Sequence, residues 1–230
     1  MNRLYEKDES LESQLSALIV DCINSGKKLP TEKQMMEMFN VSRFILREAL
    51  HVYETAGIIV SQQGSGRYVQ QPNIKNLLTN SCSILIDANP SQFLDLLEVR
   101  FMLEFGSITK IIKNISFSEI KALKEVVEQM SLRAAEGTDL HEQDRAFHNI
   151  LYSCVNNAFY QQLMENYWDL REKYNFSTYK HIAKSLVKNH EEIVVAIIAK
   201  DQDRVLSLLQ EQYEDAQFQV IMSLVAQDKK

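Results

Sequence analysis

Apolar residues recur every three or four positions through most of the chain, which is the spacing of an amphipathic helix. Near the N-terminus this spacing predicts a first helix over residues 10–25, ended by Gly26. A second helix is predicted over 31–40 and a third over 42–56, and each begins at a hydroxyl residue that can cap its first turn. Three short helices are therefore expected before the pattern changes.

The pattern changes to a β-strand type over residues 57–70, where two β-branched runs flank Gly64-Ser65-Gly66. This is typical of a β-hairpin. Helix, helix-turn-helix and hairpin in this order form a winged helix-turn-helix, in which the third helix enters the major groove of DNA. Residues 1–70 are therefore predicted to form a winged helix-turn-helix DNA-binding domain.

A polar stretch over residues 71–76, which contains Pro72, predicts a linker. Helical spacing then resumes over 77–230 and predicts an all-helical bundle of six or seven helices. The predicted helices cover 77–88, 91–113, 118–136, 140–154, 158–174, 177–199 and 202–226. The expected fold is thus mostly α.

The composition agrees with this fold class. The 230 residues are 45% hydrophobic and 24% charged, which excludes a disordered chain, and only 6 Gly and 3 Pro disfavour a sandwich or a Rossmann-type sheet. No apolar run of about 18 residues and no signal peptide are present, so we expect a cytoplasmic protein. The 3 cysteines are far apart and predict neither disulfides nor a metal or redox pair.

Charge is distributed unevenly between the two parts of the chain. Residues 27–70 have a net charge of +2, whereas the other 186 residues sum to −8 within a total of −6. A basic N-terminal part joined to an acidic body is the asymmetry expected when only one domain meets phosphate.

Two arginines give the third predicted helix its candidate chemistry. Arg43 and Arg47 are four residues apart and share a face, so the helix can present two guanidinium groups to guanine edges or phosphates. The alternative is a solvated basic face with salt bridges to Glu48 or Glu54. The hairpin that follows favours DNA binding.

Five motifs closely resemble the DNA-binding domain of GntR-family transcriptional regulators over about 40 residues. They are Leu29-Pro30-Thr31-Glu32-Lys33, Val41-Ser42-Arg43, Leu46-Arg47-Glu48-Ala49-Leu50, Gly57-Ile58-Ile59 and Gln63-Gly64-Ser65-Gly66-Arg67-Tyr68-Val69. The resemblance implies that the residues touching operator DNA are Lys33, Ser42, Arg43 and Arg47, with Gln63 and Gly64 at the tip of the wing.

This chain departs from the family pattern at three of these positions. Phe44 and Ile45 stand where many members have two threonines, and Lys33 stands where arginine is common. Two hydroxyl groups that could contact DNA are missing, and a guanidinium group that could donate two parallel hydrogen bonds is replaced by an ammonium group. We therefore do not expect the operator sequence to match that of a relative.

A second candidate cluster lies in the predicted bundle. Asp144 and His148 are spaced i, i+4, so a carboxylate and an imidazole leave one helix in the same direction, and His190 lies on a later helix. Such a set can chelate a divalent ion. The alternative is a pair of surface or hydrogen-bonded core histidines.

Residues 97–104, 144–148, 156–157 and 190–193 resemble the helical effector domain of the FadR-type subfamily, often called FCD. The resemblance implies that Asp144, His148 and His190 hold a divalent metal (zinc, nickel or manganese), and that Arg100 binds the carboxylate of an effector. It also places Gln212 where the subfamily has a fourth ligand, a histidine of the last helix. Because an amide oxygen is a poor ligand for zinc or nickel, a metal-free pocket stays open as the alternative.

These features together predict a ligand-responsive transcriptional regulator, not an enzyme, and the resemblance implies a homodimer on a pseudo-palindromic operator. We expect a repressor that a small carboxylate-type metabolite releases from DNA. One alternative is a helical metalloenzyme that carries a DNA-binding module, although Glu142 is the single general base beside the predicted ligands. The other is an effector-independent structural protein that binds DNA.

Overall fold

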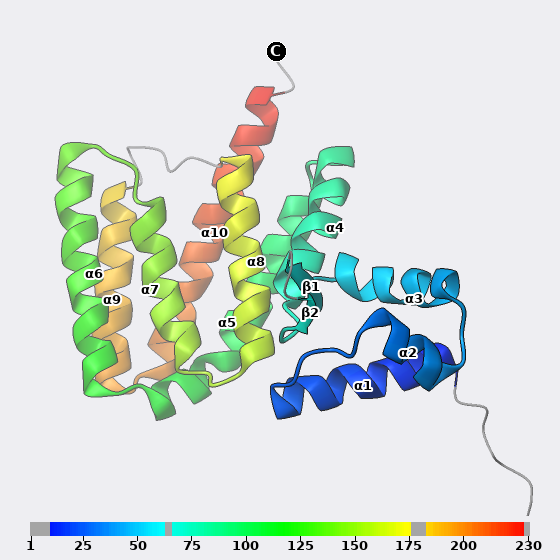
Figure 1. The fold of residues 1–230 in the computed structure, drawn as a ribbon. Coiled ribbons are helices and arrows are strands. Elements are labelled where there is room, and N and C mark those ends of the chain that lie inside the picture. The colour runs from blue at the N-terminus through cyan, green and yellow to red at the C-terminus, as the bar shows by residue number, and fades with distance from the viewer. Residues whose placement is uncertain (1–9, 63–65, 176–182, 228–230) are drawn as a thin grey trace, which may run out of the picture. The chain divides into compact units, whose positions relative to one another are not determined.

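The structure is a computed structural model that describes residues 10–62, 66–175 and 183–227 (Figure 1). The chain divides into two compact units, Met1–Asn73 and Ile74–Lys230. Each unit has its own hydrophobic core, and each is described by itself below.

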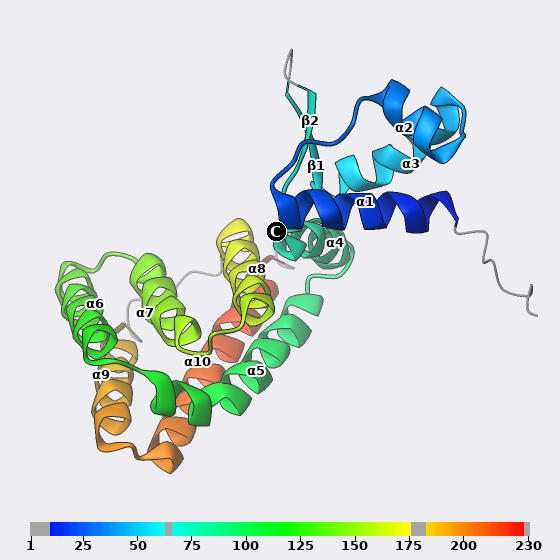
Figure 2. The same cartoon turned by 60° about the horizontal axis from the view of Figure 1, so that its bottom comes forward.

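The described part of the first unit contains three helices and two paired β-strands, which are seen from the side in Figure 2. Its elements are α1 (Leu11–Ser25), α2 (Glu32–Phe39), α3 (Arg43–Thr55), β1 (Ile59–Gln62) and β2 (Gly66–Val69). The two strands are antiparallel, with Val60 opposite Tyr68. This confirms the predicted winged helix-turn-helix.

Capping residues explain where the short helices of this unit begin. The hydroxyl groups of Ser10, Thr31 and Ser42 each accept a hydrogen bond from a backbone N–H in the first turn of α1, α2 and α3, respectively. Asn40 ends α2 in the left-handed conformation, with φ of 52°. The short turn at Asn40 brings the start of α3 next to α2, and the two helices pack against each other over the buried Leu46.

All regular elements in the described part of the second unit are helices. Its seven helices there are α4 (Ile74–Ala88), α5 (Gln92–Asn114), α6 (Phe117–Glu136), α7 (His141–Ser153), α8 (Ala158–Tyr174), α9 (Ala183–Ala199) and α10 (Gln202–Gln227). Helix α4 begins at Ile74, three residues earlier than predicted, because the N–H of Ile74 donates to Gln162 Oε1 at 2.8 Å. The predicted linker over 71–76 is accordingly shorter.

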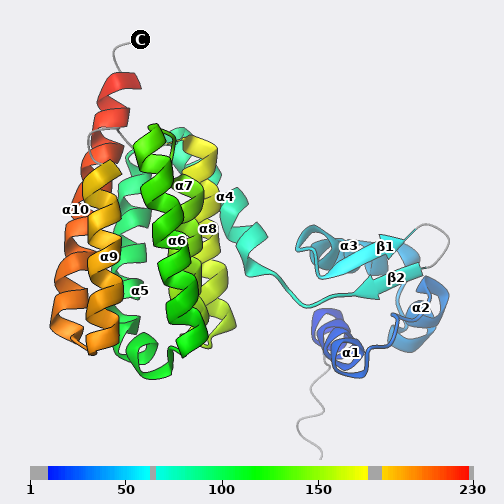
Figure 3. The ribbon, with the colours of Figure 1, turned by 90° about the vertical axis from the view of Figure 1, so that its left-hand side faces the viewer.

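The helices of this unit run alongside one another as a bundle (Figure 3). Helix α5 packs against α8 and α10, and α9 packs against α6 and α10. The core is mainly apolar, with Phe93, Phe147 and Trp168 fully buried. It also buries charged groups of α5, α7 and α8, which form the site described below. In the part of the chain that the structure describes, no helix is long and apolar enough to cross a membrane.

Candidate functional site

The first candidate site is the outer face of α3. The side chains of Arg43 and Arg47 are 64% and 59% exposed. The N-cap Ser42 Oγ accepts a hydrogen bond from the N–H of Ile45 at 3.4 Å, and its own hydrogen stays available to a phosphate. Lys33, in the first turn of α2, is also exposed. These predicted DNA contacts therefore lie on two adjacent helices.

A single carboxylate, that of Glu32, connects the arginines of this face. Arg47 Nε donates to Glu32 Oε1 and Oε2 at 3.0 and 3.2 Å, and Arg67 Nη1 donates to Oε1 at 2.8 Å. Arg43 Nε lies 3.8 Å from Oε2. Hydrogen bonds from Arg47 and Arg67 hold the pKa of Glu32 below its ordinary value. Glu32 thus supplies a local counter-charge to three guanidinium groups.

The acidic partners differ from those that the salt-bridge alternative named. Arg43 and Arg47 pair with Glu32, whereas Glu54 pairs with Arg67 at 2.8 Å. The reason is the packing of α2 on α3, which brings the first residue of α2 beside the start of α3. The predicted wing-tip contacts Gln63 and Gly64 lie outside the described residues.

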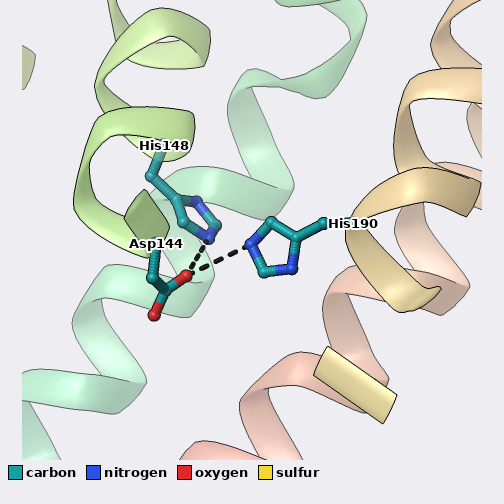
Figure 4. Close-up of side chains that lie close together, drawn as sticks. All are labelled: Asp144, His148 and His190. Atoms are coloured by element: carbon teal, nitrogen blue, oxygen red, sulfur yellow. Dashed lines mark hydrogen bonds and ion pairs between the residues drawn. The ribbon is translucent and has the colours of Figure 1, made fainter. Parts of the chain in front are cut away.

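The second candidate site is a cluster of three buried side chains in the bundle (Figure 4). Asp144 and His148 come from α7 and His190 from α9. Asp144 Oδ1 lies 3.2 Å from His190 Nε2 and 3.5 Å from His148 Nε2. One ligand atom from each of the three residues lies within 4.8 Å of the other two. The fold therefore brings together the three residues that the sequence places on two helices.

Each member of this cluster lies beside a further polar group. Arg171 Nη1 donates to Asp144 Oδ2 at 2.7 Å, and His190 Nδ1 donates to the carbonyl oxygen of Leu186 at 2.8 Å. His148 Nδ1 lies 3.0 Å from Glu104 Oε1. These contacts leave His190 Nε2, His148 Nε2 and Asp144 Oδ1 facing one another, as supporting partners do around a metal site.

The electrostatics of the cluster favour a negative carboxylate and a neutral imidazole. Burial alone would raise the pKa of Asp144, but the hydrogen bond from His190 and the charge of Arg171 hold it well below its ordinary value. Burial lowers the pKa of His148, although the charge of Glu104 opposes this. A metal requires ligands in these protonation states.

The donor set fits a divalent cation. A tetrahedral ion with bonds of about 2.1 Å separates its ligand atoms by about 3.4 Å, and two of the separations here are 3.2 and 3.5 Å. Because His190 Nδ1 donates to the carbonyl oxygen of Leu186, its Nε2 is left facing Asp144 Oδ1. A proton or a shared cation between these two atoms satisfies both of them.

Gln212 of α10 reaches the same cluster. Its Nε2 lies 3.2 and 3.3 Å from the two ring nitrogens of His190, and its Oε1 is buried without a hydrogen-bond partner. The two ends of an amide are assigned from such contacts and can be exchanged. An amide oxygen beside three ligand atoms is a weak fourth donor for a metal or an acceptor for a polar ligand.

Arg100, the predicted effector-binding residue, lies in the wall of the same cavity. It is buried, its Nε donates to Glu104 Oε1 at 2.9 Å, and its guanidinium carbon lies 4.6 Å from the ring centres of both Tyr167 and Trp168. The pKa of Glu104, which burial alone would raise, is lowered to about 2, mainly by the charge of Arg100. A fixed positive charge therefore borders the cavity.

The cavity enclosed by these groups is small. Its volume is about 30 Å³, and one water needs about 10–15 Å³. It accommodates an ion with one or two waters. Much of its lining comes from α10, including Gln212, Tyr213, Asp215 and Gln219, so a larger ligand requires these side chains to move.

Sequence reasoning missed three residues of these sites as functional groups: Glu32, Glu104 and Arg171. The sequence did contain an indication of the role of Glu104, because it lies four residues after Arg100 on one helix and can pair with it. It contained none for Arg171, which meets Asp144 across 27 residues of sequence.

Two family models match the chain. Residues 95–215 match the model described as the FCD domain, and residues 7–69 match the model described as bacterial regulatory proteins of the gntR family. The first match covers more than half of the chain and includes Arg100 and the cluster of Asp144, His148 and His190.

Curated relatives are similar over most of their length. An uncharacterized HTH-type transcriptional regulator, YcbG of Bacillus subtilis, is 27% identical over 200 residues, which is 84% of this chain and 82% of the relative. The Uxu operon transcriptional regulator of Escherichia coli is 26% identical over 203 residues, or 82% and 78% of the two chains.

A solved structure shares the fold. The GntR protein of Streptococcus agalactiae superposes with a TM-score of 0.62 at 21% identity, over 90% of this chain and 96% of that one.

Proposed function

Since this chain belongs to the GntR family of bacterial regulatory proteins and carries an FCD domain, we propose that it is a repressor which a small carboxylate releases from DNA. It is a ligand-responsive, DNA-binding transcriptional regulator. The observation that supports the ligand most directly is the buried set of three mutually facing donor atoms on Asp144, His148 and His190.

The first unit binds operator DNA in this proposal. Arg43 and Arg47 at the start of α3 present guanidinium forks to guanine edges or phosphates, and Lys33 and Ser42 contact the backbone. Glu32 orients Arg47 through two hydrogen bonds. The wing, with Gln63 and Gly64 at its tip, contributes the remaining contacts.

The protein acts as a homodimer in this proposal, because a pseudo-palindromic operator pairs with two-fold symmetry. Exposed apolar side chains on the neighbouring helices α5 and α10 support association with a second copy. They are Val99, Met102, Phe105, Phe218, Ile221, Met222 and Val225.

The second unit binds the effector. Arg100 attracts its carboxylate, and Asp144, His148 and His190 hold a divalent cation such as zinc, nickel or manganese. Such a cation would supply positive charge that attracts an anionic ligand. Arg171 and Glu104 keep the side chains of Asp144 and His148 in place. A small polar anion is the ligand class that this set of groups recognises.

Ligand binding is coupled to DNA through the second unit. The cavity holds little more than an ion and water, so an organic effector displaces side chains of α10 when it enters. Only differential affinity for two conformations can shift their populations. We infer that the ligand favours a dimer geometry in which the two α3 helices no longer match the half-site spacing.

We propose that the protein is not an enzyme. Glu142, the general base that a metalloenzyme would need beside the cluster, is exposed and lines a separate depression with Glu172 and Asn175. The charged groups that touch the cluster, Arg171 and Glu104, already pair with Asp144, Arg100 and His148.

Selection of duplexes from a random-sequence DNA library tests the regulator. The wild-type protein is expected to enrich a pseudo-palindromic sequence, and Arg43→Ala combined with Arg47→Ala is expected to abolish the enrichment while circular dichroism stays unchanged. Lys110→Ala with Lys113→Ala, which removes two exposed charges from α5, serves as the charge-matched control. Enrichment by the double arginine variant would contradict the assignment of α3.

A further inference from the structure

An aromatic side chain lies exposed in the first turn of the DNA-binding helix. Phe44 is 74% exposed and Ile45 is 50% exposed. Among the described residues of the first unit, Phe44 is the most exposed large apolar side chain. Exposing an apolar surface of this size has a free-energy cost in the free protein, and the core of the unit does not use it.

The position of Phe44 relates it to the DNA-binding arginines. Helix α3 turns its apolar side to the core through Leu46 and Leu50, which are fully buried. Phe44 follows Arg43 directly and lies three residues before Arg47, so it shares the first helical turns with both guanidinium groups. The N-terminal residues of a recognition helix are those that reach base edges in the major groove.

The major groove offers one apolar group to such a side chain. Guanine, cytosine and adenine present hydrogen-bond donors and acceptors there, whereas thymine adds its 5-methyl group. The side chains of phenylalanine and isoleucine cannot donate or accept a hydrogen bond. Contact between these side chains and a base edge is therefore favourable where the base presents the thymine methyl group.

We propose that Phe44, with Ile45 beside it, determines operator specificity by contacting the 5-methyl groups of thymines next to the bases or phosphates bound by Arg43 and Arg47. The inference rests on the proposed DNA-binding function and adds the base class that the half-site must contain. Arginine supplies hydrogen bonds and charge, and Phe44 supplies an apolar contact that does not depend on salt.

Replacement of thymine by uracil tests the proposal, because it removes the 5-methyl group and leaves base pairing unchanged. The probe is the duplex that the wild-type protein selects from the random library, prepared with thymine or with deoxyuridine in its half-sites. We expect the wild-type protein to bind the uracil duplex about fourfold more weakly for each contacted methyl, the factor for losing about one buried methyl contact.

Two variants assign the effect to the residue. Phe44→Ser is expected to bind the thymine duplex more weakly and to distinguish thymine from uracil much less than the wild-type protein. Val52→Ser removes another exposed apolar side chain of α3, about two turns after Phe44, and is expected to keep the full discrimination.

The outcomes separate this inference from the function on which it rests. Equal binding of both duplexes by the wild-type protein, or unchanged discrimination by Phe44→Ser, would overturn the thymine contact while the regulator stands. If no duplex is enriched at all, the DNA-binding function is wrong and the inference falls with it.

Discussion

Arg171 donates a hydrogen bond to Asp144 Oδ2 at 2.7 Å in the interior of the helical unit, and both side chains are buried. The other carboxylate oxygen, Oδ1, faces His190 and His148. One carboxylate oxygen of Asp144 thus pairs with the guanidinium group of Arg171, and the other faces the two histidines of the cluster.

Asp144→Asn is expected to destabilise the helical unit by about 3–5 kcal/mol, because it leaves the buried guanidinium of Arg171 without its counter-charge. Urea unfolding followed by the fluorescence of the single tryptophan, Trp168, measures the change. A loss of less than about 1 kcal/mol would mean that water already compensates Arg171.

Glu125→Gln is the control for this variant. It removes the partner of Lys121 from an i, i+4 pair whose side chains are 70% and 59% exposed. Because solvent screens such a pair, we expect a change within about 0.5 kcal/mol.

Glu32→Gln is expected to tighten binding to random-sequence DNA several-fold and to steepen its salt dependence. The substitution removes the counter-charge of Arg43, Arg47 and Arg67, so more positive charge meets phosphate. Preference for the selected duplex over random DNA should fall, since Arg47 also loses the groups that orient it. Fluorescence anisotropy over a salt series measures both, with Glu37→Gln on the same helix as the control. Weaker binding of Glu32→Gln to random DNA would contradict the role of Glu32 as a counter-charge to these arginines.

Stability should depend on Glu32 in a defined pH direction. Its pKa in the folded protein lies below the ordinary value of 4.5, because Arg47 and Arg67 donate to it. Its contribution is therefore fully present above about pH 4.5 and is lost as pH falls through the lowered pKa. We expect the free energy of unfolding of the wild-type protein to exceed that of Glu32→Gln by about 0.5–1 kcal/mol at pH 7. This difference should shrink in acid. Urea unfolding by circular dichroism at both pH values checks this; a difference that grows in acid would reverse the sign.

Metal content is expected to depend on His148 and Gln212. Protein purified without chelator or a histidine tag should contain about one equivalent of zinc, nickel or manganese per chain, and His148→Ala should contain none. Gln212→His replaces a weak amide donor by imidazole, so this variant should keep its metal at a chelator concentration that strips the wild-type protein. Absence of metal from the wild-type protein and from Gln212→His would leave a hydrogen-bonding pocket instead.

Local signals were enough to predict most of the fold. The caps at Thr31 and Ser42 and the glycine-containing sequence between the two β-branched runs locate α2, α3 and the two strands from adjacent residues alone. The start of α4 could not be located in this way. It depends on the contact of Ile74 with Gln162, which lies 88 residues away in sequence.

The candidate sites were predictable only where the signal lies within one helix or one motif. The i, i+4 spacing of Asp144 and His148 indicated a shared direction, and the fold adds His190. Arg171 joins the same cluster through tertiary packing, for which periodicity carries no information. The same holds for Glu32, whose role arises because α2 packs on α3.

The most direct test of the account measures the affinity for the selected duplex with and without small hydroxycarboxylates and dicarboxylates. We expect at least one of them to weaken DNA binding by the wild-type protein about tenfold or more. The same compound should leave His148→Ala unaffected while that variant still binds the duplex. Specific DNA binding that no carboxylate changes, or an equal response of His148→Ala, would contradict a carboxylate effector held at the cluster of Asp144, His148 and His190.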